Sequence, residues 1–418
     1  MTSQVLDSEK AVSKERLYVF LLAAIQFTHI VDFVVMMPLG PTLMRVMDIS
    51  PIQFASLVSS YNFSAAIAGV LYGIIADRFG RKKLLVVCFI GFILGTLACG
   101  LTHEFEFLLT ARIIAGAFGG VLNGIVFAIT ADLIPFHRRG AAMGVIMSSF
   151  SIASILGVPI GLAIADSFGW QKTFWFIAAF GVPVAIASPY VFPTLRDHIK
   201  NKTPIEDLKR FGILLMNMKY LKAYMLIFLM AVSSFSIIPF LSPYAVKNVG
   251  LAESDLKYIY LVGGLFTVVT SRLVGKASDR FGSFHVFSSL AFFSFIPIYL
   301  YTTAPPMGLA LFLALSAFFM TVVSGRFIPV MTLASEVPES EDRGTFMGLL
   351  NSIRALGSAS ATLIGGAIII ETQSGKLERF DMVGFFSMAV SLLAIGISWS
   401  VWKIVKKKRM REQKVERA

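Results

Sequence analysis

Three polar residues near the N-terminus have the chemistry and spacing to move a proton. Gln26, His29 and Asp32 stand three apart in an apolar run that begins near residue 17, so on a helix they share roughly one face. Asp32 falls about midway along the run, where a charge inside a membrane costs about 2.5 to 3.5 kcal/mol and needs a cavity or a partner. We expect Asp32 to take up and release a proton, His29 to relay it, and Gln26 to line a binding cavity. The alternatives are a permanently paired structural aspartate, a hydrogen-bonded interior histidine and a glutamine that only packs.

A cation in the fourth apolar run could be the partner of Asp32. Arg112, Gly116 and Asn123 recur at helical spacing in the segment ARIIAGAFGGVLNG, whose small residues let a neighbouring backbone approach closely. Arginine cannot shed its charge, and Asp32 is the only acid well inside an apolar run of the first half of the chain. We therefore predict an ion pair between Asp32 and Arg112, and we place Asn123 in the binding cavity. Because Arg112 is only one or two turns from the start of its run, an arginine that reaches back to the membrane surface is the alternative.

A second intramembrane arginine, Arg326, lies in the run that begins near residue 308 and has no acid near it there. It could face an anionic ligand, a cluster of backbone carbonyls, or Asp32 across a cavity. The sequence leaves structural and ligand-binding roles open, and we place Arg326 in the predicted substrate cavity.

The tetrapeptide Asp-Arg-Phe-Gly occurs twice and marks an internal duplication. The copies begin at Asp77 and Asp279, and a second matching pair, Arg139-Gly140 and Arg343-Gly344, follows at nearly the same offset. We expect a tight turn with positive φ at Gly80. We also expect the charged residues around it to hold one conformation of a helical bundle that moves, and so to act as a gate. The alternative is a solvated basic loop. Because only the first copy is followed by three basic residues, it is the copy expected to gate. The residues assigned to this gate are Gly73, Asp77, Arg78, Gly80, Arg81, Asp279, Arg280 and Gly282.

The elements that must position these residues are apolar helices. Of the 418 residues, 56% are hydrophobic and 15% are charged, a balance too apolar for a soluble domain of this length. A membrane span takes about 20 apolar residues, so we predict an all-α integral membrane protein of twelve transmembrane helices in two six-helix halves. The apolar runs begin near residues 17, 52, 84, 107, 141 and 172, and again near 222, 254, 284, 308, 344 and 380.

The polar breaks between these runs predict the boundaries and the orientation of the chain. The net charge of +12 gathers at both tails, in the central linker and in alternate loops. This asymmetry is typical of cytoplasmic segments, so we expect both termini in the cytoplasm, an inner (plasma) membrane location, and membrane lipid rather than nucleic acid as partner. The predicted parts are an N-terminal tail (1–16), a first bundle (17–195), a cytoplasmic linker (196–221), a second bundle (222–404) and a basic tail (405–418).

The segment from Gly73 to Lys82 resembles the loop signature of the major facilitator superfamily, G-x-L-A-D-R-x-G-R-K, with Ile75 as one conservative departure. The resemblance covers essentially the whole chain. It implies two six-helix bundles with a site near the midplane between them. Arg112 and Gly116 are similar to the fourth-helix signature R-x-x-x-G, in which the arginine is linked to proton coupling. The run around Arg326 resembles the bacterial drug- and sugar-efflux branch of the superfamily.

The fifth apolar run bears on the direction of transport. Antiporters of the superfamily often carry G-x8-G-x3-G-P-x2-G-G here, and the register gives Gly144, Gly157 and Gly161, with the proline displaced to Pro159. Half of the signature is present, which suggests antiport. On structural grounds alone, Gly157, Pro159 and Gly161 are expected to bend the helix and allow close packing.

Together these features predict a secondary active transporter that exports a small organic solute or drug in exchange for protons by alternating access. The alternatives are a proton-coupled importer or uniporter and, from another class, a lipid-handling flippase or a non-transporting receptor on the same scaffold. No phosphate-binding loop, metal-ligand cluster or HExxH motif is present, so we expect no enzyme, cofactor or metal. The expected partners are a small-molecule substrate, protons and lipid, and the chain is expected to be a monomer.

Overall fold

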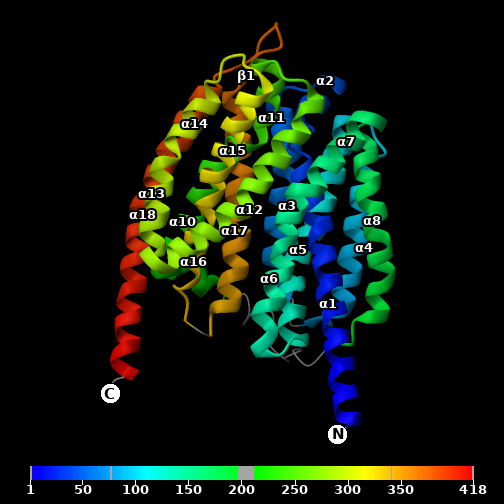
Figure 1. The fold of residues 1–418 in the computed structure, drawn as a ribbon, viewed down its shortest axis with the longest axis vertical. Coiled ribbons are helices and arrows are strands. Elements are labelled where there is room, and N and C mark those ends of the chain that lie inside the picture. The colour runs from blue at the N-terminus through cyan, green and yellow to red at the C-terminus, as the bar shows by residue number, and fades with distance from the viewer. Residues whose placement is uncertain (1, 76–77, 196–210, 340, 417–418) are drawn as a thin grey trace.

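Long helices running along a common direction make up the protein (Figure 1). The computed structural model describes residues 2–75, 78–195, 211–339 and 341–416. The first half contains α1 (Thr2–Val35), α2 (Gly40–Val46), α3 (Pro51–Ile75), α4 (Arg81–Cys99), α5 (Phe105–Leu133), α6 (Phe136–Ile152), η2 (Ala153–Gly157), α7 (Val158–Phe168) and α8 (Trp170–Val191). The second half contains α10 (Met218–Phe235), η3 (Ile238–Phe240), α11 (Leu241–Tyr244), η4 (Ala245–Val249), η5 (Glu253–Asp255), α12 (Leu256–Phe281), α13 (Ser283–Phe293), α14 (Phe295–Thr302), α15 (Leu309–Gly325), α16 (Phe327–Ser335), α17 (Arg343–Ile368), β1 (Ile370–Glu371), β2 (Leu377–Glu378) and α18 (Phe380–Glu416).

The predicted all-α membrane fold is confirmed. Within the described part of the chain, eleven helical segments are long and apolar enough to cross a membrane. The helix α17, with 26 residues, is not among these eleven because it is rich in glycine and serine and carries Arg354. It nevertheless packs against both α3 and α10, so it occupies a place in the bundle. The exact number of twelve spans therefore stays a prediction.

Helices extend across two of the predicted boundaries. The first helix α1 runs through residue 16 without a break, and α18 continues across residue 405 to Glu416. Both predicted tails are thus continuations of long helices. The second bundle begins with α10 at Met218, slightly before the predicted residue 222, and residues 196–210 of the predicted linker lie outside the described residues.

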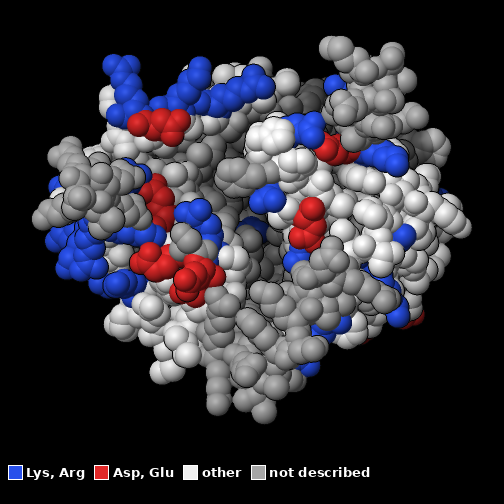
Figure 2. Space-filling view, turned by 90° about the horizontal axis from the view of Figure 1, so that it is seen from below, with Lys and Arg blue, Asp and Glu red and all other residues white. Residues whose placement is uncertain are grey.

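The two halves meet most tightly on the face opposite the termini. Both termini lie on one face, called here the terminal face, and the opposite one is called the far face (Figure 1). Near the far face a buried apolar cluster takes Leu43 and Phe54 from the first half and Phe240 and Tyr301 from the second. The rings of Phe54 and Phe240 meet edge to face with centroids 6.1 Å apart, a favourable aromatic geometry. The terminal face is hollowed near its centre (Figure 2), so this conformation is sealed at the far face and opens toward the terminal face.

Glycines set the close spacing of α3, α4 and α5. A Cβ added to Gly120 would lie 2.5 Å from Cα of Ala65 on α3, and one added to Gly95 would lie 2.9 Å from the backbone nitrogen of Ala115 on α5. Neither distance is sterically possible without movement of the backbone. Small residues of this kind allow helices to pack closely inside a membrane, and here they fix α5 against its two neighbours.

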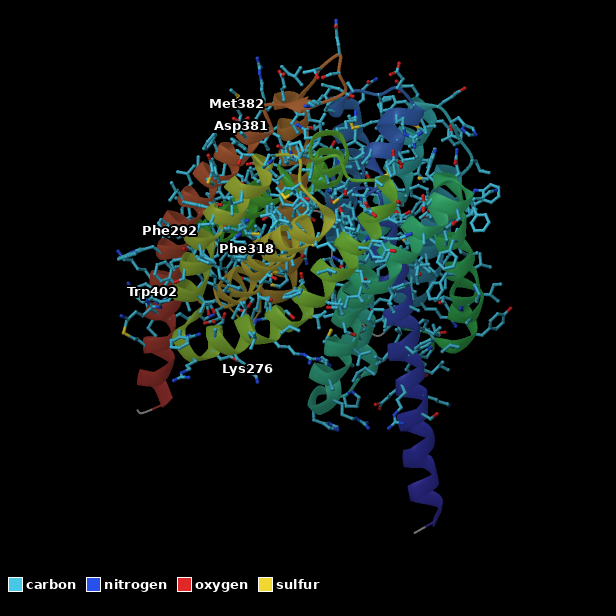
Figure 3. All side chains as sticks on the ribbon, turned by 45° about the horizontal axis from the view of Figure 1, so that its top comes forward. Lys276, Phe292, Phe318, Asp381, Met382 and Trp402 are labelled. Carbon is cyan, nitrogen blue, oxygen red and sulfur yellow. The ribbon has the colours of Figure 1, made fainter. Side chains whose placement is uncertain are left out.

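Large apolar side chains cover the outer surface of the bundle. Phe292 is 68% exposed and projects from the outer side of the second half. Lys276 lies near the end of α12, and Asp381 lies near the start of α18 (Figure 3). Apolar side chains around the girth and charges at the helix ends suit a protein whose surroundings are lipid.

Enlarging Gly95 should destabilise the bundle. Because the added side chain has no space against α5, we expect Gly95→Leu to lower the free energy of unfolding by about 1–3 kcal/mol, measured by thermal unfolding of the purified protein in detergent. Gly144→Leu on α6 is the matched control, since an added Cβ there meets nothing within 4 Å. Equal stability of the two variants would contradict the proposed packing role.

Candidate functional site

Asp32 of α1 and Arg112 of α5 form a fully buried ion pair. Nη1 of Arg112 donates to Oδ2 of Asp32 at 2.9 Å, and both side chains are 0% exposed. The hydroxyl of Thr96 on α4 donates to the other carboxylate oxygen at 3.1 Å. Two neighbouring helices therefore satisfy both carboxylate oxygens. The predicted ion pair is present, and the alternative of an arginine that reaches the membrane surface is wrong for this conformation.

Arg112 uses only part of its hydrogen-bonding capacity in this pair. Among the residues that the structure describes, its Nε and Nη2 atoms have no hydrogen-bond partner. The guanidinium carbon lies 4.4 Å from the ring centroid of Tyr61 on α3, a distance typical of a cation–π interaction. A guanidinium with unused donors can hold a second acceptor without first leaving its place.

The other predicted residues of the first half lie on the same contact between α1 and α5. Nε2 of Gln26 donates to Oδ1 of Asn123 at 3.0 Å, which joins the two helices. His29 lies next to the rings of Tyr61 and Phe92, with centroids 6.1 and 5.8 Å from its own. Its Nδ1 atom is buried and has no hydrogen-bond partner within the described part of the chain. The structure thus brings these polar groups together, while their roles in proton relay and substrate binding stay predictions.

Arg326 is enclosed by hydroxyl groups in the second half. It lies at the break between α15 and α16 and is 1% exposed. Its Nη1 atom donates to Ser294 at 3.1 Å and to Ser391 at 3.0 Å, and its Nη2 atom donates to Ser234 at 3.2 Å. Asp32, one of the partners considered from the sequence, is instead bound to Arg112. A direct contact of Arg326 with substrate stays a prediction that would require these helices to move apart.

Arg81 anchors the first copy of the repeated tetrapeptide. It begins α4, pairs with Asp132 near the end of α5, and donates its backbone N–H to the carbonyl of Leu195 at 3.3 Å. The preceding Gly80 is the N-cap residue of α4, with φ −60° and ψ 123°. The predicted positive φ at Gly80 is wrong because the chain enters the helix directly from an extended residue.

The remaining gate residues of the first copy lie around the end of α3. Gly73 packs against the ring of Phe211, which belongs to the segment that leads into the second half. Arg78 is half-buried, and its Nε and Nη2 atoms lack partners among the described residues. Asp77 lies outside the described residues. Gating by this loop therefore stays a prediction.

The second copy is built differently. Gly282 ends α12 with φ 86°, a left-handed backbone conformation that favours glycine. Asp279 and Arg280 are exposed near the end of α12, and the Arg280 guanidinium lies 5.2 Å from the ring centroid of Phe281. The positive-φ turn expected in the first copy is thus found in the second.

The predicted bend in the fifth apolar run coincides with a change of helix type. A π-helical turn, η2, ends at Gly157 between α6 and α7, and Pro159 is at the start of α7. A Cβ on Gly157 would meet the side chain of Val31 on α1, and one on Gly264 of α12 would lie 3.3 Å from the backbone of Ser154. Gly161 also accepts a hydrogen bond from the Thr173 hydroxyl at 2.8 Å. The π turn thus contacts both halves, and π turns often occur at functional positions in helices.

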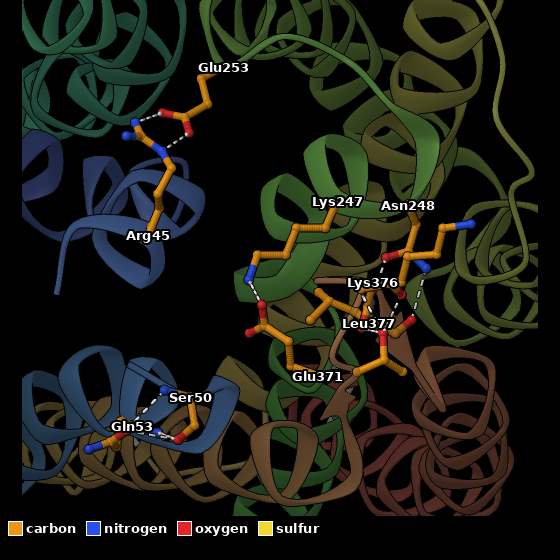
Figure 4. A network of polar contacts seen from close by, with 11 residues as sticks. Arg45, Ser50, Gln53, Lys247, Asn248, Glu253, Glu371, Lys376 and Leu377 are labelled. Carbon is orange, nitrogen blue, oxygen red and sulfur yellow. Dashed lines mark hydrogen bonds and ion pairs between the residues drawn. The ribbon is translucent and has the colours of Figure 1, made fainter. Parts of the chain in front are cut away.

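Polar contacts between the halves at the far face were not predicted from the sequence (Figure 4). Nε of Arg45, at the end of α2, donates to Oε1 of Glu253 in η5 at 3.0 Å, and the hydroxyl of Thr42 donates to the same carboxylate at 2.5 Å. Hydrogen bonding and the charge of Glu253 raise the pKa of Arg45. Within the second half, Lys247 pairs with Glu371 of β1. These contacts join loops far apart in the sequence, so periodicity carried no signal for them.

Arg354 of α17 is a further cation near the contact between the halves. In the structure the guanidinium lies 5.9 Å from the ring centroid of Phe327 on α16 and interacts electrostatically with His29 of α1. Arg354 is therefore a half-buried cation between the two halves.

Comparisons with known proteins agree with this architecture. The family model described as Major Facilitator Superfamily matches residues 22–362. The chain is 23% identical to Multidrug resistance protein 2 of Bacillus subtilis over 94% of this chain and 97% of that protein, and 22% identical to a probable sugar efflux transporter of Mannheimia succiniciproducens over 81% and 82%. Among solved structures it is similar to an inward-facing bacterial homologue of the human lysosomal transporter Spinster, with TM-score 0.73, 16% identity and coverage of 94% and 98%.

Removing one partner of the buried ion pair should destabilise the protein more than removing both. Asp32→Asn leaves an unpaired guanidinium and Arg112→Gln leaves an unpaired carboxylate, so we expect each to lose about 3–5 kcal/mol of unfolding free energy. The double variant should recover part of that loss, as measured by thermal unfolding in detergent. Glu106→Gln, an exposed acid in the first turn of α5, is the control and should change little. A double variant less stable than both single variants would contradict the coupling.

Proposed function

This chain belongs to the Major Facilitator Superfamily, and from that premise we propose that it exports a small organic solute or drug in exchange for protons. The predicted family is confirmed, and the protein is a multi-pass membrane transporter of small molecules rather than an enzyme. Proton coupling, direction and orientation are the parts that we propose. The single observation that carries the proton coupling is the buried pair of Asp32 and Arg112.

Protonation of Asp32 would change the electrostatics of this pair. With a neutral carboxyl group, Arg112 would lose its counter-charge and would seek another acceptor with its unused Nε and Nη2 donors. Rearrangement of α1 and α5 around Arg112 would then favour a second conformation of the bundle. A proton and a substrate that favour different conformations are coupled through this shared equilibrium.

Alternating access requires that the contact that closes the space between the halves can form at one face and then at the other. Support comes from the present conformation, in which the apolar cluster closes the far face while the terminal face is hollowed (Figure 2). The π turn η2 contacts α1 and α12 and is the place where we expect the fifth run to bend. The loop around Arg81 would hold α4 and α5 together as the halves move.

Export rather than import is supported by the chain's relatives and by its charges. One relative is named for multidrug resistance and another for sugar efflux. The basic residues of the tails lie toward the terminal face, and basic segments typically remain in the cytoplasm, so we propose that this face is cytoplasmic in the inner membrane. The conformation described is then open to the cytoplasm, where an exporter collects its substrate.

A lipid-handling role is the second candidate because the first half carries an apolar groove. The groove has a volume of about 690 Å³ between α1, α6 and α8. Phe20, Phe27 and Phe180 line it, and Arg16 and Arg138 lie at its terminal-face end. A groove with aromatic walls and a basic end suits an acyl chain with an anionic headgroup.

Replacing Asp32 should uncouple proton movement from transport. We expect Asp32→Asn to abolish substrate-driven proton flux, because an amide cannot take up the proton, and Asp32→Glu to retain part of it. The measurement is the internal pH of sealed proteoliposomes during transport of a substrate found by a thermal-shift screen. Glu106→Gln is the control acid on the surface of α5. Undiminished proton flux in a folded Asp32→Asn variant would refute the assigned role.

Lipid scrambling distinguishes the second candidate. If the protein exports solutes, proteoliposomes should translocate fluorescent phosphatidylglycerol no faster than protein-free vesicles in a dithionite-quenching assay. Faster translocation that Phe27→Ala slows, with Phe292→Ala on the outer surface as the control, would favour lipid handling through the groove.

A further inference from the structure

A cation without an acid lies between the halves. Arg354 of α17 lies above the ring of Phe327 and interacts electrostatically with His29 from the opposite half. Its Nε atom is buried without a hydrogen-bond partner among the described residues, and within the same part of the chain no ion pair involves its guanidinium. The side chain is half-buried, so it is partly accessible to solvent and partly removed from water.

The charges deep within the helices do not balance. Asp32 is fully buried and committed to Arg112, with both side chains 0% exposed. Arg326 is surrounded by neutral serine hydroxyls. Two guanidinium groups, those of Arg326 and Arg354, therefore contribute positive charge that no deep acid among the described residues offsets. Uncompensated charge inside a protein in a membrane is unfavourable, so an anion that entered between the halves would gain interaction energy.

The charge of Arg354 lies near an aromatic ring, and aromatic rings also meet elsewhere between the halves. The ring centroid of Phe327 lies 5.9 Å from the guanidinium carbon. Elsewhere between the halves, Phe33 of α1 and Phe235 of α10 approach each other with ring centroids 6.2 Å apart. An aromatic wall favours a flat apolar ligand, whereas the guanidinium favours a carboxylate, with which it can form two parallel hydrogen bonds.

We propose that this transporter selects organic anions, and that Arg354 binds the carboxylate of an aromatic acid between the halves. This inference rests on the proposed transport function and names the substrate class of that site. The ring of the ligand packs toward Phe327. Arg326, enclosed by serine hydroxyls in this conformation, adds positive potential.

Three naphthalene compounds of the same size separate charge from shape. Binding of 2-naphthoate, 2-naphthamide and 2-naphthylmethylammonium to the purified full-length chain in detergent would be measured by titration calorimetry. The wild-type protein should bind the carboxylate at least about tenfold tighter than the amide, the scale of a charge-assisted hydrogen bond, and should bind the ammonium compound least.

Variants then assign the preference to one residue. Arg354→Gln should remove the preference for the carboxylate, and Arg354→Lys should keep part of it. Arg343→Gln is the matched control, because it removes the same charge from an exposed position at the start of the same helix. A wild-type protein that binds the amide or the ammonium compound as tightly as the carboxylate, or none of the three, overturns the proposal. So does a folded Arg354→Gln variant that keeps the preference.

These results are independent of the test of proton coupling. If neutral or cationic solutes are exported with proton flux that depends on Asp32, the proposed function stands and the anion preference fails. If 2-naphthoate binds through Arg354 but no proton flux accompanies its transport, the anion preference stands and the coupling fails.

Discussion

The exclusion of water from the interior of the bundle is the constraint on which the arrangement depends. A charge placed there must find a partner, and the partner must come from another helix. Asp32 and Arg112 meet this requirement across α1 and α5, and Thr96 of α4 completes the carboxylate's contacts. Three helices are thereby fixed at one level, and glycines such as Gly95 let their backbones come close enough for these side chains to meet.

The second half meets the same constraint in a different way. Asp32 and Ser234 are separated by the same number of residues as the two copies of the tetrapeptide, which begin at Asp77 and Asp279. Ser234 is therefore the counterpart of Asp32 in the duplication, so the second half has a serine where the first half has an acid. Both residues contact an arginine, Arg112 in one case and Arg326 in the other. A pair of opposite charges can change its state by gaining a proton, whereas a guanidinium held by hydroxyl groups has a fixed charge. The duplicated bundle therefore has one half whose buried pair could change its charge, as the proposed proton coupling requires, and one half whose buried charge is constant.

The sequence was sufficient where one physical requirement left a single solution. Hydropathy predicted the helices, and the need of a buried arginine for an acid predicted the pair with Asp32 because that half offered no other deep acid. It was insufficient where the answer depends on distant segments or on local backbone geometry. The position of Arg354 opposite α1 depends on how the two halves pack, which residue spacing does not report. The extended conformation of Gly80 depends on where α4 begins. The contact of Arg45 with Glu253 joins loops of different halves, which no periodicity reports.

The contact between the halves at the far face combines an exposed ion pair with buried apolar groups. The side chain of Arg45 is 63% exposed in its pair with Glu253, and an ion pair so open to water contributes at most about 1 kcal/mol. Closure must then come mainly from burial of apolar groups such as Phe54 and Phe240. The free energy gained by burying apolar surface is proportional to the buried area and has no directional requirement. A second apolar contact at the terminal face could therefore replace the contact at the far face with little net change in free energy. The exposed ion pair of Arg45 with Glu253 would set the register of the closed halves, and under the proposed proton coupling a change of charge at Asp32 would bias the choice between the two contacts.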